Sequence, residues 1–157
     1  MKDNQCPINV IMVSLDEKFC KKVAKSLSDR LSMFFADCKE MVEYDLINPK
    51  EVLEKCGLEY FKKRERAVIN NCSQYQNTVV SIDADVFLEN TDLFDKSLII
   101  YLRLDKTKVS LIVNRLSFEG YDEHLQDNAD ISLKLDNKIT AETVKKIIRI
   151  MGEKLWT

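Results

Sequence analysis

The sequence predicts an α/β fold in which a five-stranded parallel sheet carries helices on both faces. Five apolar segments alternate with amphipathic ones, which is the pattern of successive βαβ units. The first apolar segment, residues 8–14 (INVIMVS), has no charge and no alternation, as expected of a strand buried on both faces. Only 3 glycines and 2 prolines are present, too few for the many tight turns of an all-β sandwich.

The composition narrows the class of protein. A chain of 157 residues has the length of one domain, which we place at residues 1–157. The formal net charge is −2 and no run of lysine or arginine exceeds three residues, so we expect no nucleic-acid partner. No apolar run approaches the roughly 20 residues of a membrane helix, and the N-terminus lacks a signal-peptide core. We therefore expect no membrane attachment and a cytoplasmic location.

The cysteines and the histidine do not form a recognisable metal site. The five cysteines are far apart in the sequence and show neither a CxxC pair nor a zinc-ligand spacing. We expect them to be free thiols, and the single histidine, His124, to be an exposed loop residue. The sequence thus predicts no bound metal.

The first half of the chain divides into strands and helices as follows. A charged turn at residues 15–18 leads from the first strand into a helix at 19–31, and Ser14 with Glu17 has the spacing of a capping box. Residues 33–37 (MFFAD) form a second strand, and residues 38–47 have no clear pattern. Asn48 and Pro49 open a helix that Gly57 ends, and another helix follows at 58–70. After a polar loop at 71–77, residues 78–82 (TVVSI) form the third strand.

The second half of the chain adds two strands. Residues 98–102 form the fourth strand and residues 105–116 a helix. The polar, acidic stretch 117–128 has the composition of a mobile loop. Residues 129–135 (ADISLKL) alternate, as a half-exposed edge strand does, and Thr140 caps a last helix. We predict the strand order 2-3-1-4-5, with the charge-free first strand in the centre and the alternating strand at an edge.

Ligands of open parallel sheets bind beyond the carboxyl ends of the strands. Three groups of residues are expected at that edge, namely residues 14–19, 37–39 and 83–85. The turn at 14–19 joins a strand to a helix without any glycine, so it is not expected to form an anion-binding nest.

Residues 57–65 (GLEYFKKRE) resemble the GExxFRxxE segment of shikimate kinases. The family's first strand and helix, ILIGFMGSGKSTVGRALAERLGMPFIDTD, aligns without a gap with IMVSLDEKFCKKVAKSLSDRLSMFFADCK. The family's TGGG stretch falls on residues 82–85, and its final AD on Ala129 and Asp130. This resemblance implies a P-loop kinase-like three-layer sandwich. It also implies a relation to ATP- and magnesium-dependent phosphorylation in aromatic amino acid biosynthesis.

The family's phosphate loop is altered at every defining position. In GxxGxGK[ST] the glycines allow close backbone approach, the lysine neutralises phosphate and the hydroxyl holds magnesium. The corresponding residues here are Ser14, Glu17, Phe19, Cys20 and Lys21. The resemblance therefore identifies a degenerate phosphate loop with no intact catalytic residue.

The substrate-pocket positions of the family are altered too. Its FxDxD motif keeps the first aspartate as Asp37 but has Lys39 for the second, and its FRxxE motif has Lys62 for arginine and keeps Glu65. The three glycines correspond to Asp83, Ala84 and Asp85. Between Leu116 and Ala129 the chain has too few residues for the family's arginine-bearing lid.

Three functions are compatible with these residues. The first is a pseudoenzyme that needs no cofactor and binds an unknown protein partner or a small hydroxy-acid ligand. The second is an active phosphotransferase whose rearranged ATP–magnesium site uses Lys18, Lys21 or Lys22 in place of the lost lysine. The third is an unrelated small-ligand binder on the same fold. Asp83 and Asp85 are either turn formers or ligands for a cation or a basic molecule.

Overall fold

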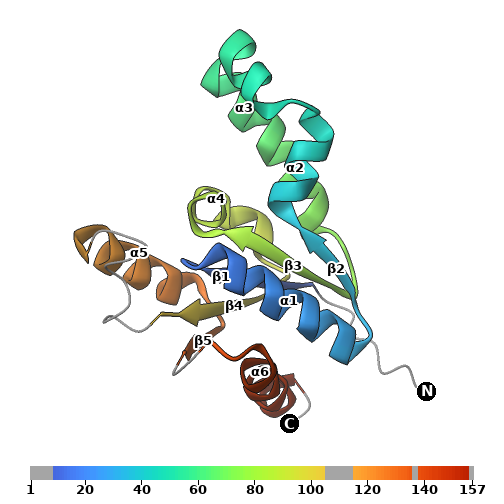
Figure 1. The fold of residues 1–157 in the computed structure, drawn as a ribbon, viewed down its shortest axis with the longest axis vertical. Helices are drawn as coiled ribbons and strands as arrows, with labels where there is room; N and C mark the ends of the chain where they lie inside the picture. Colours follow the sequence, from blue (N-terminus) through green and yellow to red (C-terminus); the bar gives the residue numbers. More distant parts are fainter. Residues whose placement is uncertain (1–8, 105–114, 136–137, 156–157) are drawn as a thin grey trace.

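The structure is a computed structural model that describes residues 9–104, 115–135 and 138–155 (Figure 1). Five strands pair in parallel in the order β2-β3-β1-β4-β5, which confirms the predicted sheet and strand order. Val10 of the central strand lies opposite Val79 on one side and Leu98 on the other. The strands are β1 (Val10–Ser14), β2 (Phe34–Asp37), β3 (Thr78–Asp83), β4 (Leu98–Arg103) and β5 (Ile131–Lys134).

Helices cover both faces of the sheet, as predicted. They are α1 (Glu17–Leu31), α2 (Cys38–Leu46), α3 (Pro49–Ser73), α4 (Ala84–Glu89), the 3₁₀ helix η1 (Thr91–Phe94), α5 (Arg115–Asn128) and α6 (Thr140–Leu155). Val10 and Met12 pack on α1 and α6, whereas Ile11 and Val13 pack in a second apolar cluster with α2, α3 and α4. All four side chains are fully buried, so β1 is the centre of both cores.

Helices α2 and α3 form an arm that projects from the sheet (Figure 1). Asn48 caps the start of α3 by accepting a hydrogen bond from the amide of Glu51 at 3.1 Å, and Pro49 follows it, both as predicted. Gly57 has φ 87° and ψ 166°, so it separates a helical segment at 49–56 from another at 58–73. The predicted break at Gly57 is thus a sharp kink within the arm.

The stretch 117–128 is not the loop that its polar composition predicted, because it forms most of helix α5. The inward residues of α5 include Asp122 as well as Leu125, so the buried face is partly polar and its helical period is masked in the sequence. His124 accordingly lies exposed on a helix and not in a loop. The predicted helix at 105–116 lies almost entirely outside the described residues.

The predicted cap of the last helix also differs. Thr140 is itself the first residue of α6 and does not precede it. In the part of the chain that the structure describes, no helix has both the length and the apolarity needed to span a membrane.

Candidate functional site

The carboxyl ends of β1, β2 and β3 meet at one edge of the sheet, as the parallel topology requires. Ser14 at the end of β1 pairs with Asp83 at the end of β3, and Asp37 at the end of β2 pairs with Ser81. Two adjoining cavities open at this edge and share Lys39, Glu43, Ile82 and Asp83 among their lining residues.

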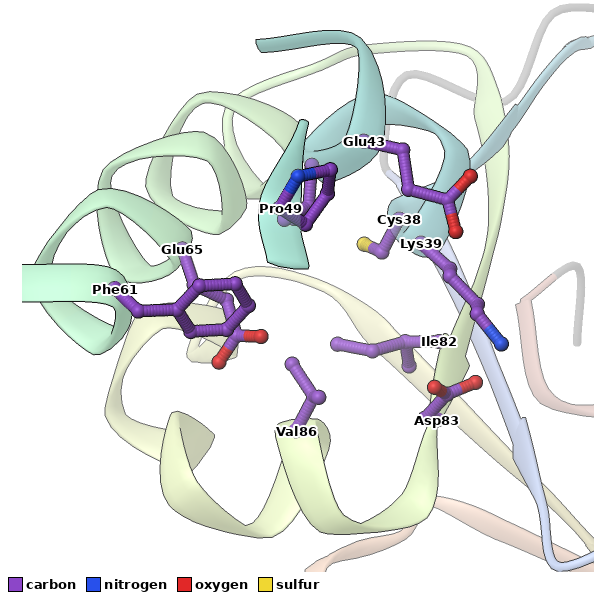
Figure 2. Close-up of a pocket in the computed structure, with 10 residues that line it drawn as sticks. Cys38, Lys39, Glu43, Pro49, Phe61, Glu65, Ile82, Asp83 and Val86 are labelled. Atoms are coloured by element: carbon purple, nitrogen blue, oxygen red, sulfur yellow. The ribbon is translucent and has the colours of Figure 1, made fainter. Parts of the chain in front are cut away.

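The first cavity, about 240 Å³, lies between α2, α3, α4 and the end of β3 (Figure 2). Its walls are mostly apolar, and charged groups lie at its ends. In Figure 2, Asp83 and Lys39 lie at one end, and Phe61 and Glu65 lie at the other. The apolar wall consists of Val42, Pro49, Phe61, Ile82 and Val86, with Cys38 beside them.

The second cavity, about 300 Å³, lies beside the start of α1. It takes in Glu17, Cys20 and Lys21 from the turn and helix that follow β1, together with Asp37 and Glu40. These residues include three of the five positions that align with the family's phosphate loop. The sheet edge therefore brings together much of the predicted site, divided between two cavities.

The start of α1 is capped by Asp16, and the predicted capping box of Ser14 and Glu17 does not form. Asp16 Oδ1 accepts a hydrogen bond from the amide of Phe19 at 3.2 Å, and Asp16 Oδ2 lies 2.6 Å from Lys138 Nζ. Ser14 Oγ instead donates to the carbonyl of Leu102 at 2.9 Å. Because α1 begins at Glu17, Asp16 occupies the cap position that the sequence assigned to Ser14.

The turn before α1 lacks the conformations of an anion nest. Among the described residues, positive φ occurs at Ser32, Ile47, Gly57 and Asn77, and none of these lies in residues 14–19. Phe19 is buried in the core, so its side chain fills the space beside the turn. The expectation that this turn has no nest geometry is confirmed.

Two further aligned positions of the phosphate loop, Cys20 and Lys21, are engaged within the protein. Cys20 is buried, its Sγ donates to the carbonyl of Met12 at 3.4 Å, and burial followed by the charge of Asp37 raises the pKa of its thiol. Lys21 is ion-paired with Glu40, and this hydrogen bond raises the pKa of the ammonium group. Because the Cys20 thiol is buried and the Lys21 ammonium group is already paired, neither residue offers an unpaired cation to a phosphate.

Asp37 has a structural role at the end of β2. Its Oδ1 accepts a hydrogen bond from Ser81 Oγ at 2.6 Å, and its Oδ2 accepts from the amide of Glu40 at 3.2 Å, which caps α2. Lys39, two residues further along the chain, is exposed and lines both cavities. The two residues aligned with the aspartates of FxDxD therefore lie at the same edge of the sheet, but Asp37 stabilises the fold whereas Lys39 lines both cavities.

Lys62 is held by two carboxylates and does not line the first cavity. Its Nζ lies 3.3 Å from Glu65 Oε1 and 3.0 Å from Glu89 Oε2. Burial would lower the pKa of this ammonium group, but the hydrogen bonds and charges of Glu89 and Glu65 raise it. Glu65 itself is buried and lines the cavity.

The three residues that align with the family's glycines have different surroundings. Asp83 lines both cavities, and burial, followed by the charge of Glu17, raises the pKa of its carboxyl group to about 6. Ala84 is buried in the core, and Asp85 is exposed and accepts a hydrogen bond from the Tyr121 hydroxyl of α5. Asp83 precedes α4 without capping it through its side chain, so the cap that a turn-forming aspartate would supply is missing there.

Metal ligation finds no support among the described residues. They contain no cluster of three or more histidine, cysteine, aspartate or glutamate side chains arranged to hold an ion. The four described cysteines, Cys20, Cys38, Cys56 and Cys72, are free thiols, as predicted, and Cys6 lies outside the described residues.

Several residues of the site were missed by reasoning from the sequence. Lys138 approaches Asp16 from 122 residues away, and no local pattern signals such a contact. Phe61 and Val86 line the first cavity from two separate helices, α3 and α4, and no local pattern signals that they share a cavity. Asp16 had a detectable signal, since aspartate is as good an N-cap as serine.

Comparisons with known proteins agree with this architecture. A family model described as shikimate kinase matches residues 21–143. The structure is similar to that of a shikimate kinase from Aquifex aeolicus, at 20% identity and a TM-score of 0.79 over 94% of this chain and 98% of that chain. A shikimate kinase from Acinetobacter baumannii in complex with shikimate has 17% identity and a TM-score of 0.77 over 97% and 96%.

A gluconokinase from Sinorhizobium meliloti is more distant, at 11% identity and a TM-score of 0.62 over 97% of both chains. None of the curated proteins matches the sequence.

Proposed function

The chain belongs to the shikimate kinase family, and we propose that within it the chain is a pseudoenzyme, which keeps the fold, transfers no phosphate and serves as a binding or scaffolding module. The observation that carries this proposal is the closed start of α1. Asp16 occupies the amide of Phe19 and pairs with Lys138, at the place where the family binds the nucleotide phosphates. A helix N-terminus favours an anion, and here that anion is the protein's own carboxylate.

ATP and magnesium do not fit the residues present. Phosphoryl transfer depends on positioning and charge neutralisation, because there is little covalent chemistry for the protein to supply. The aligned lysine position is the buried Cys20, and the aligned hydroxyl position is Lys21, which is paired with Glu40. We therefore derive no step through a nucleotide and propose that the protein acts without a cofactor.

The substrate side of the site also argues against the family reaction. Lys62, which aligns with the arginine that binds the shikimate carboxylate, is neutralised by Glu65 and Glu89. Asp83 and Glu43 add negative charge to the cavity that an anionic substrate would enter. Like charges at short range repel, so the residues present disfavour the binding of shikimate as well as that of the nucleotide.

We propose that a ligand binds in the first cavity, or that a partner protein binds to the arm formed by α2 and α3. A small hydroxy-acid ligand is the family-based alternative for the cavity, where its carboxylate would have to bind near Lys39 because Glu43 and Asp83 are negatively charged. The arm exposes Tyr44, Ile47 and Leu58, whose apolar side chains are otherwise uncovered in the described structure. A binding module or scaffold built on the family fold would use either the first cavity or the exposed apolar side chains of the arm.

Calorimetry with ATP and magnesium, run beside a coupled assay that contains shikimate, tests the proposal. We expect neither heat of nucleotide binding nor turnover. Micromolar affinity together with turnover that Lys21→Ala or Lys22→Ala abolishes would establish the rearranged kinase instead. Lys25→Ala, on the exposed face of α1, is the matched control for loss of a lysine.

A further inference from the structure

Asp83 is a half-buried carboxylate at the site, and within the described residues it has no side-chain hydrogen bond or ion pair. Its carboxylate borders both cavities, caps no helix through its side chain, and has a pKa raised by burial. A half-buried carboxylate without a partner is unfavourable, and a cation that bound beside it would relieve that cost. Resting on the proposed role of this cavity in binding, we infer that the two cavities form a site for a small organic amine, with the ammonium group beside Asp83 and the apolar body in the first cavity.

The shape of the first cavity suits such a ligand. Phe61 and Val86 form one part of an apolar wall, and Ile82 continues it to the carboxylate of Asp83 (Figure 2). Ligand pockets typically combine apolar walls with a few polar groups that fix orientation. Here the polar groups lie mainly at the ends, so a ligand with one charged end and an apolar body is complementary to the cavity.

The charge of the lining selects an amine over an acid. In the first cavity Glu43, Glu65 and Asp83 face one cation, Lys39. Glu65 is partly compensated by Lys62, but Glu43 and Asp83 have no ion pair within the described structure.

The second cavity adds further carboxylates. Glu17, Asp37 and Glu40 line it together with Lys18 and Lys21, of which Lys21 is already paired with Glu40. Six carboxylates and three lysines line the two cavities, so a carboxylate ligand would meet net repulsion and an ammonium group net attraction.

The groups that face Asp83 come from four elements. Glu17 of α1, Asp37 of β2 and Asp85 of α4 each raise the pKa of Asp83, while Lys39 of α2 lowers it. The Cys20 thiol of α1 is also near, and its own pKa is raised by the charge of Asp83. With a pKa of about 6, Asp83 is ionised at neutral pH and becomes neutral as the pH falls through that value. An amine held by Asp83 should therefore bind less tightly in mild acid.

Three probes of the same shape and different charge test this inference. They are cyclohexylmethylamine, cyclohexanecarboxylate and cyclohexylmethanol, titrated by NMR into the full chain. We expect the amine to bind at least about tenfold more tightly than the acid, with the alcohol between them. Asp83→Asn should weaken amine binding about tenfold, whereas Glu54→Gln, on the exposed side of the arm, should leave it unchanged.

The pH dependence provides a test in the unmodified protein. The amine remains protonated throughout, so a fall in its affinity between neutral pH and about pH 5 reports Asp83. Affinity that does not change with pH, tighter binding of the acid, no binding of any probe, or amine binding that survives Asp83→Asn would each overturn the inference. Turnover of ATP would instead refute only the pseudoenzyme proposal, because these titrations contain no nucleotide.

Discussion

Asp83 binds its proton more tightly in the folded protein than in the unfolded chain. Burial and the nearby charge of Glu17 raise its pKa to about 6, above the ordinary value of 3.8. A raised carboxyl pKa means that the folded state binds the proton more tightly than the unfolded state. The stability that this group contributes is therefore present at low pH and is lost as the pH rises from about 4 through 6.

Asp83→Asn should stabilise the protein at neutral pH. After allowance for solvent exposure we expect a gain of about 1 kcal/mol, or roughly 2–4 °C in melting temperature, since the amide has no charge to desolvate. Calorimetric melting at neutral pH and at about pH 4 measures this, and the gain should shrink at the lower pH. The control is Asp95→Asn, at an exposed position. A loss of stability at neutral pH, or an equal gain at both pH values, would contradict the prediction.

The sequence could narrow the N-cap residue of α1 to Ser14 or Asp16 but could not decide between them. Ser14 and Asp16 are both good N-cap residues, and Ser14 also has a glutamate three residues further on, as a capping box requires. Two distant groups decide between them: the carbonyl of Leu102 takes the Ser14 hydroxyl, and the ammonium of Lys138 holds the Asp16 carboxylate. Neither contact is local, so no motif of a few residues encodes it.

Among the elements, α3 depends on one glycine. Gly57 has φ 87° and ψ 166°, a backbone region that is essentially restricted to glycine. The kink turns residues 58–73 so that Phe61 and Glu65 reach the first cavity. A side chain at this position would strain the kink, although nothing would clash with its Cβ.

Gly57→Ala should lower the free energy of unfolding by about 1–3 kcal/mol through backbone strain alone. Urea denaturation followed by circular dichroism measures the change. Gly120→Ala in α5 is the matched control, because no atom lies within 4 Å of the added methyl group there and φ is not positive. That control should be neutral or slightly stabilising, by up to about 1 kcal/mol. A Gly57→Ala variant as stable as the parent would show that the kink is not strained by a side chain.

Helix α5 is joined to the sheet by a polar network. Asp122 accepts hydrogen bonds from the Tyr101 hydroxyl at 2.7 Å, from Arg103 at 3.1 Å and from Gln126 at 2.9 Å. Burial would raise the pKa of Asp122, but the bonds from Arg103 and Tyr101 lower it overall. The sequence did not reveal this helix because its inward face includes a carboxylate whose partners lie on β4.

Asp122→Ala should destabilise the protein by about 3 kcal/mol, since it leaves Arg103 and the buried Tyr101 hydroxyl without their partner. Because the pKa of Asp122 is lowered, its contribution is complete at neutral pH and is lost as the pH falls below about 4. The gap in urea midpoint between parent and variant should therefore narrow in acid. Glu123→Ala, the exposed neighbour, serves as control. If both variants lose the same small amount of stability, Asp122 does not anchor α5.

At the scale of the whole molecule, the sheet was predictable and the cavities were not. Within the predicted order 2-3-1-4-5, the uncharged first strand indicated the centre of the sheet and the alternating last strand an edge, because burial on two faces or on one leaves a pattern in the residues themselves. The same order placed Asp37, Lys39 and Asp83 at one edge. What the sequence could not predict is that Lys62 points away to Glu89, since that depends on how the arm meets α4.

The whole protein should not be stabilised by nucleotide. A ligand that binds only the folded state at a hundred times its dissociation constant would add about 2.7 kcal/mol, or roughly 5–10 °C in melting temperature. We expect millimolar ATP with magnesium to give no such shift in a thermal-shift assay. A clear upward shift with ATP and magnesium, absent with magnesium alone, would argue for a nucleotide sensor if turnover were still missing.

The central position of β1 also governs how the chain is made. β1 is synthesised first, but its two neighbours are β3 and β4, so its ladder is complete only after Arg103 has been added. At about 5–20 residues per second this takes roughly 5–20 s on a ribosome. During that time the uncharged edges of the VIMVS segment have no partner, and an unpaired apolar strand readily associates with other chains. We therefore expect the risk of association with other chains to be greatest between the synthesis of β1 and that of β4.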